Sequence, residues 1–110
     1  MYPDIVFLYV IMNRDPRYSV VQSMYEKGNI KSFFDIFIYV PKTRVGLDIG
    51  MRVDRLNKFL NKVETFTLEH IDRIAFLCDM DLDVMMELWR KEYRLQKEKR
   101  KTKVPALIKK

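Results

Sequence analysis

The stretch KTRVGLDIGMRVDRLNKFLN, which covers residues 42–61, constrains the fold of this chain more than any other part of it. It contains two short helical patterns on either side of Gly50. A glycine at such a corner can adopt a positive φ, which larger residues resist. Gly46, one turn earlier, leaves little bulk between the two helices. The spacing predicts helices over Lys42–Ile49 and residues 53–60 that cross almost at right angles.

The second of these predicted helices projects outward and carries long polar side chains. Its apolar residues Leu56 and Phe59 fall on the side that would pack against Val45 and Ile49 of the first helix. The polar side chains on its outer side are Arg52, Asp54, Arg55, Asn57 and Lys58. A projecting helix of this kind has the shape and chemistry that the major groove of DNA accepts.

The basic charge of the chain is confined to two regions. The 110 residues have a formal net charge of +6, although residues 1–40 are neutral overall and residues 63–89 carry a net charge of −6. Residues 41–62 carry six basic and two acidic groups, and residues 90–110 carry ten basic and two acidic groups. This segregation indicates an anionic partner for both basic regions. For the C-terminal region, a solvated helix end with a frayed charged terminus is the alternative.

Helical spacing extends over most of the remaining chain. It predicts helices over residues 17–27 and 67–78, and a last helix after the aspartates of residues 79–83. Thr67 is the expected N-cap of the helix over residues 67–78. The side chains expected to face inward from that helix are Leu68, Ile71, Ile74, Ala75 and Cys78. Because the chain has only three glycines and four prolines, we expect an all-α bundle of five or six helices.

The segment at residues 30–39 has two interpretations. It is rich in β-forming residues and fits a buried strand. Its apolar residues Ile30, Phe33, Phe34 and Phe37 nevertheless recur at helical spacing, with Asn29 as an N-cap. We therefore predict a helix whose aromatic stripe belongs to the core.

We expect three parts along the chain: an N-terminal extension over residues 1–13, a folded domain over 14–96 and a basic tail over 97–110. The apolar run over residues 5–12 is too short to span a bilayer and lacks the features of a signal peptide. Met12 is the expected natural start, with a β-strand or a dimer contact in the preceding residues as the alternative. Residues 104–110, interrupted by Pro105, are expected to be mobile.

The residue inventory argues against an enzyme. One cysteine and one histidine cannot supply a structural zinc site, and Cys78 lies in the apolar run IAFLC, as a buried thiol of a reducing compartment would. The aspartates at 79, 81 and 83 lack the glycine and glutamate of a calcium loop. We expect no catalytic residues, no metal, no cofactor and no small-molecule ligand, and we expect a cytoplasmic location away from membranes.

Several local patterns resemble the lambda-repressor-like (Cro/XRE-type) helix-turn-helix domain. The run from Gly46 to Gly50, followed by Leu56, matches the family's small residue, glycine and apolar residue. Asn61 and the sequence Thr67-Leu68-Glu69 match the end of the second motif helix and the start of the next helix. The similarity covers residues 30–88. The longer stretch with IKSFFDIF before PKTRVGLDIG and FTLEHIDRIA after it is also similar to a group of small bacterial proteins.

The resemblance implies a transcriptional regulator that binds double-stranded DNA. Lys42 and Arg44 would approach phosphates, and Asn61 and Lys62 would return toward the DNA backbone. The reading face would comprise Arg52, Val53, Asp54, Arg55, Asn57 and Lys58. Three positions depart from the family pattern: Val53 and Asp54 stand where amide or basic residues are frequent, and Lys42 stands where glutamine is usual.

The alternative is a protein-interaction module that kept this fold without sequence-specific DNA binding. It is favoured by the acidic residues 63–89 and by Asp54 in the reading helix. Because members of the family often act as dimers, the resemblance also allows a homodimer, although the sequence shows no heptad seam. The sequence does not identify a DNA target.

Overall fold

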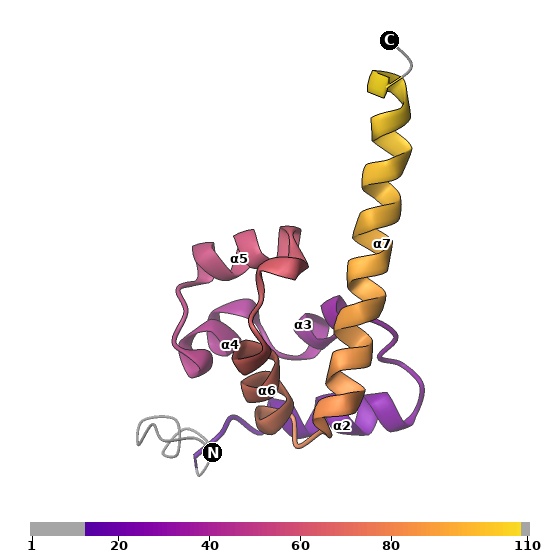
Figure 1. Cartoon of the computed structure of the whole chain (residues 1–110). Helices are drawn as coiled ribbons and strands as arrows, with labels where there is room; N and C mark the ends of the chain where they lie inside the picture. Colours follow the sequence, from indigo (N-terminus) through magenta and orange to yellow (C-terminus); the bar gives the residue numbers. More distant parts are fainter. Residues whose placement is uncertain (1–12, 109–110) are drawn as a thin grey trace.

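The computed structural model describes residues 13–108, with side chains up to Lys101. Within this range it contains six α-helices, two short 3-10 helices and no strand (Figure 1). The all-α prediction is therefore confirmed for the described residues, whereas the expected extension lies almost wholly outside them. In chain order the elements are α2 (Arg17–Glu26), η1 (Phe33–Asp35), α3 (Ile36–Tyr39), α4 (Lys42–Ile49), α5 (Val53–Asn61), η2 (Val63–Thr65), α6 (Leu68–Leu77) and α7 (Leu82–Ile108).

Helices α2 and α6, like α4, are followed by a residue with left-handed backbone geometry. After α2, Gly28 has a φ of 83° and its N–H donates to the carbonyl oxygen of Tyr25 over 3.0 Å. After α6, Asp79 takes the same role with a φ of 55°. Such a residue closes a helix because it turns the chain back onto the last carbonyl groups. The Arg14 guanidinium also donates to the Leu77 carbonyl oxygen over 3.0 Å, which ties the N-terminal segment to the end of α6.

The segment at residues 30–39 is helical, but its helix is shorter than predicted. It begins after Ser32 instead of Asn29, and the Asp35 carboxylate accepts the Ser32 N–H over 3.3 Å. This later start changes which side chains face the core. Ile36 is fully buried, whereas Phe34 is 40% exposed, so the predicted aromatic stripe is only partly correct.

Helix α6 begins at the predicted cap. Thr67 Oγ1 accepts the N–H of His70 over 3.2 Å, and His70 Nδ1 accepts the N–H of Thr67 over 3.1 Å. The residues buried as predicted are Ile71, Ile74, Ala75 and Cys78. The prediction for Leu68 is wrong, because its side chain is 60% exposed. Helical side chains lean toward the N-terminus, so the first residue of the helix projects past its end.

Helix α7 is much longer than its apolar pattern suggests. Met85 and Leu88 are buried near its start, and the helix then continues without a break through Pro105 to Ile108. Residues 97–108, expected to form a separate tail, therefore extend the helix beyond the globular part of the molecule and past α5 (Figure 1). Among the described residues, no helix has both the length and the apolar character needed to cross a bilayer.

Candidate nucleic-acid interface

The corner between α4 and α5 depends on both glycines of the motif. Gly50 has φ 80° and ψ 33°, in the left-handed region that glycine adopts without strain. The following residue, Met51, donates its N–H to the carbonyl oxygen of Gly46 over 2.7 Å. A Cβ at Gly46 would lie 2.5 Å from the Met51 carbonyl oxygen, so only glycine fits there without movement. The predicted turn is confirmed: Gly50 supplies the conformation and Gly46 supplies the space.

The apolar residues around this corner hold α5 on the body of the molecule. Val45, Ile49, Met51 and Leu56 are all buried, as the sequence predicts. Phe59 is half-buried, and its ring meets the Phe66 ring edge to face with centroids 5.4 Å apart. Because the inner side of α5 is fixed in this way, its opposite side faces outward at the edge of the globule (Figure 1).

The outer side of α5 carries most of the predicted contact residues. Val53 is 37% exposed, next to the turn. The exposed polar residues are Arg52, Asp54, Arg55, Asn57, Lys58, Asn61 and Lys62. The structure therefore brings these eight predicted residues together on one helix and the two residues that cap it.

Two of the cations on α5 have neighbours that orient them. The Arg55 guanidinium lies over the Phe59 ring, 5.3 Å from its centroid. Such a cation–π contact holds the group without neutralising its charge. Arg52 Nε lies 3.4 Å from Asp54 Oδ1 in an exposed ion pair, which solvent weakens. Asp54 therefore offsets the charge of Arg52 and leaves that of Arg55 in place.

Arg44 is engaged inside the protein. Its Nε and one terminal nitrogen donate to the two carboxylate oxygens of Asp48 over 3.2 and 2.8 Å. Asp48 is only 6% exposed and also accepts the Tyr18 hydroxyl over 2.6 Å. Burial and the bond to Asp48 raise the pKa of Tyr18. This network ties α2 to α4, so Arg44, which was predicted to contact phosphate, helps to position α4.

Sequence reasoning missed this network, although the sequence contains a signal for it. Asp48 lies three residues after the core residue Val45 and one before the core residue Ile49, so it belongs to the inner flank of α4. An acid at such a position needs a partner, and Arg44 is one turn earlier. The second partner of Asp48, Tyr18, lies 30 residues away in the chain and can be identified only from the tertiary structure.

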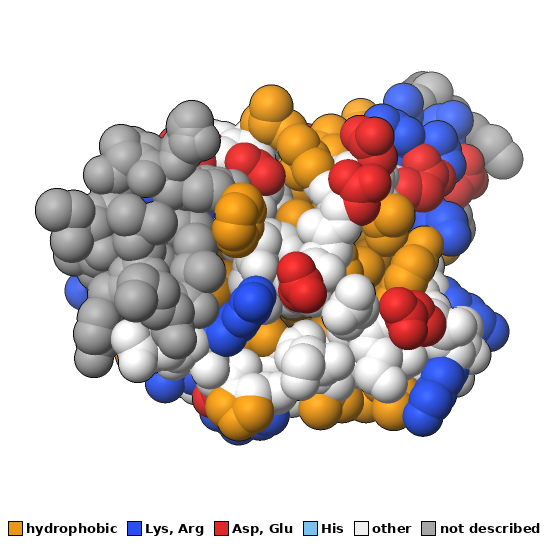
Figure 2. All heavy atoms as spheres, turned by 90° about the horizontal axis from the view of Figure 1, so that it is seen from below, with side chains coloured by type: hydrophobic (Ala, Val, Ile, Leu, Met, Phe, Trp, Pro, Cys, Tyr) orange, Lys and Arg blue, Asp and Glu red, His pale blue; other side chains and the backbone are white. Residues whose placement is uncertain are grey.

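The positive charge of residues 41–62 is thereby assigned to particular side chains. The two acidic residues of this region, Asp48 and Asp54, pair with Arg44 and Arg52. The excess of four charges rests on Lys42, Arg55, Lys58 and Lys62, which are all exposed. Figure 2 shows the molecule from the side opposite α5, where acidic and basic side chains are interspersed among apolar and uncharged ones.

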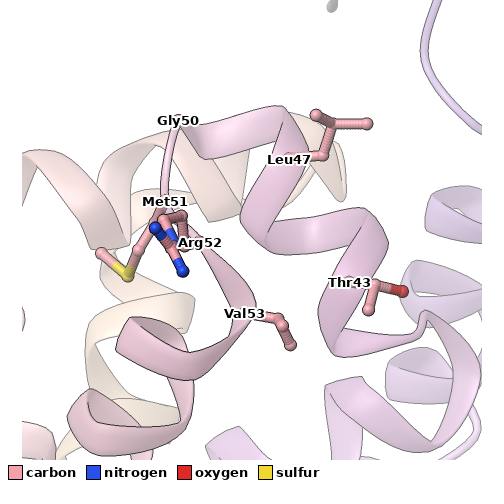
Figure 3. Close-up of a pocket in the computed structure, with 6 residues that line it drawn as sticks. All are labelled: Thr43, Leu47, Gly50, Met51, Arg52 and Val53. Atoms are coloured by element: carbon pink, nitrogen blue, oxygen red, sulfur yellow. The ribbon is translucent and has the colours of Figure 1, made fainter.

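A hollow of about 370 Å³ lies between α4 and the start of α5. Figure 3 shows Val53 projecting from α5 toward α4. Leu47 on α4 is 67% exposed beside this hollow. The complete lining is Thr43, Leu47, Gly50, Met51, Arg52 and Val53. Thr43 and Leu47 were not among the predicted residues; they face outward between the buried positions of α4.

Polar side chains of α7 fix the C-terminal end of α5. Gln96 donates to the Leu60 carbonyl oxygen over 2.7 Å and accepts the Val63 N–H over 3.1 Å. Trp89 donates its indole N–H to the Val63 carbonyl oxygen over 2.8 Å. Arg100 makes two bonds to the Glu64 carboxylate, over 2.9 and 3.1 Å, and lowers the pKa of that group. The orientation of α5 therefore depends on α7, a helix that begins only at Leu82.

Comparison with protein-family models, with curated proteins and with solved structures gives no significant match for this chain.

Proposed function

We propose that this chain is a DNA-binding protein of the lambda-repressor-like helix-turn-helix type, with α5 as the helix that enters the major groove. The observation that carries the proposal is the tight corner at Gly50, which presents a helix with a buried inner side and a basic outer side. A short turn containing glycine between two such helices is the arrangement used by helix-turn-helix proteins. A transcriptional regulator in the cytoplasm is the role we assign to it.

The residues have different roles in this proposal. Arg55, held over Phe59, is the candidate base contact, because a guanidinium can donate two bonds to one guanine. Lys42, Lys58 and Lys62 are the candidate phosphate contacts, which fix register without reading sequence. Asn57 and Asn61 add exposed amide groups to the same side of α5, and Val53 can contact a thymine methyl group.

The salt dependence of duplex binding tests this function. The four cations Lys42, Arg55, Lys58 and Lys62, near phosphates, should together contribute about −4 to the slope of log K against log salt. Fluorescence anisotropy with a labelled duplex of mixed sequence measures this slope. Lys58→Gln should reduce its magnitude by about 0.9. Lys27→Gln, which removes an exposed lysine after α2, is the matched control and should leave the slope unchanged. Equal effects of the two variants would contradict the proposal.

The hollow beside Leu47 favours a second candidate, a protein-interaction module. Leu47 and Val53 together expose an apolar surface at the corner, which a protein side chain could fill. This candidate predicts that duplex affinity is absent even at low salt. Leu47→Ser would then leave folding intact and abolish binding of a protein partner.

A further inference from the structure

The geometry points to a second DNA-contacting surface: the distal part of α7 is a basic arm that binds the phosphate backbone beside the groove that α5 enters. This inference rests on the proposed function of α5. It gives residues 97–108 a specific position on the duplex, in place of the diffuse attraction of a frayed tail.

The arm extends well beyond the C-terminal end of α5. The bonds of Gln96 to Leu60 and Val63 place residue 96 level with the C-terminal end of α5. Helix α7 continues for 12 residues from there to Ile108, or about 18 Å at 1.5 Å per residue. In Figure 1 this arm rises past α5, on the side away from α4 and α6.

The arm is longer than the major groove of DNA is deep. The major groove of B-DNA is about 8.5 Å deep, which is roughly half the length of the arm. When α5 lies in the groove, the arm therefore extends beyond the groove edge and must pass close to a phosphate backbone. An acidic or apolar arm would oppose this placement, whereas a basic arm stabilises it.

The charges on α7 fit such a contact. Arg90, Arg94, Lys97 and Lys101 follow one another at spacings of four, three and four residues, so they share one flank of the helix, and all four are exposed. Glu87 pairs with Arg90 over 2.8 Å and lies 3.8 Å from Arg94. Lys97 Nζ lies 5.9 Å from the centroid of the Tyr93 ring, which orients its ammonium group. Beyond the reach of Glu87 the flank carries Lys97 and Lys101, with the exposed Glu98 next to Lys97 and three residues before Lys101.

A second copy of this chain is the competing occupant of the arm. Leu95 is 51% exposed on α7 and could contribute to a helix pair. Two such arms would, however, bring like charges together, which destabilises close pairing. We therefore assign the arm to DNA, and a dimer becomes an outcome of the test.

The test compares two variants of equal charge on the same helix. Lys97→Gln with Lys101→Gln removes two charges from the basic flank, and Lys91→Gln with Lys99→Gln removes two from the rest of the helix. Anisotropy titrations of the full chain with a labelled duplex give the salt slope of each. The flank variant should reduce the magnitude of the slope by about 1.8, and the control by less than about 0.5. Thermal melts establish that both variants are folded.

Each other outcome overturns the inference. Equal reductions of the salt slope in both variants would show that DNA attracts the whole charged helix without a preferred flank. An unchanged salt slope in both would show that the arm does not reach DNA. A dimer in sedimentation velocity that Leu95→Ala dissociates, with DNA binding unchanged in the flank variant, would assign the arm to self-association. If Lys58→Gln weakens binding but the flank variant does not, only this inference fails. If the native chain binds no duplex at low salt, the proposed function fails with it.

Discussion

Replacing Arg44 with alanine should destabilise the fold, although Arg44 belongs to the same surface as Lys42. Its guanidinium is the countercharge of Asp48, which is 6% exposed and keeps only the Tyr18 hydroxyl after the substitution. Breaking a buried ion pair costs about 3–5 kcal/mol. Because the Arg44 side chain is 35% exposed and water screens the pair, we expect the smaller loss of about 2–3 kcal/mol.

Urea unfolding followed by far-UV circular dichroism measures this loss, with an unchanged m-value expected. The thermal midpoint should fall by roughly 10 °C. Lys42→Ala is the control, since Lys42 is exposed on the same helix and its removal should change stability by less than about 0.5 kcal/mol. Equal stability of the two variants would refute the structural role of Arg44. If Arg44→Ala lowered the salt slope of DNA binding as much as Lys42→Ala, with both variants folded, the assignment of the Arg44 charge to Asp48 alone would be contradicted.

Three further predictions concern the corner, the cap and the support of α5. Gly50→Val should destabilise the protein by about 1–3 kcal/mol, because a β-branched residue is strained at φ 80°, and Gly50→Asn should cost less; equal thermal midpoints for the two would contradict this. Burial, followed by the nearby Arg55, lowers the pKa of His70, so the unfolded chain binds this proton more readily and stability should fall as the pH drops below about 6.5. His70→Gln keeps an acceptor for the Thr67 N–H, and urea unfolding at several pH values should show a smaller loss of stability toward low pH in this variant. If the dependence of stability on pH were unchanged, His70 would be excluded as its source. Gln96→Ala should destabilise the protein by about 1–3 kcal/mol and speed hydrogen exchange at the end of α5, because it leaves the Leu60 carbonyl oxygen without this bond; unchanged exchange there would contradict the support by α7.

The sequence predicts the corner between α4 and α5 well because its physics is local. Glycine is needed at Gly50 for its φ and at Gly46 for space, and both requirements appear within five residues of sequence. The outward side of α5 follows from the same short stretch, since burying Leu56 sets which residues are exposed. The boundaries of α4 therefore agree with the prediction, and α5 ends at Asn61, one residue later than predicted.

The sequence does not predict the length of α7 or its contacts. Beyond Tyr93 the helix is held by polar groups, such as Gln96 and Arg100, which bind backbone and side-chain atoms of η2. Hydrophobic periodicity carries no information about such bonds. Similarly, Arg44 was assigned to phosphate from charge alone, because its partners Asp48 and Tyr18 are identified only once α2 packs on α4. Buried polar networks of this kind need the tertiary structure.

The measurement that tests the central claim most directly is amide chemical-shift mapping of the ¹⁵N-labelled chain on addition of duplex DNA at low salt. If α5 enters the major groove, the shifts should concentrate at residues 52–62 and at the start of α4, and should reverse when salt is added. The amides of α2 should remain unaffected. Shifts confined to α2, or an unchanged spectrum with excess duplex, would contradict DNA recognition by α5.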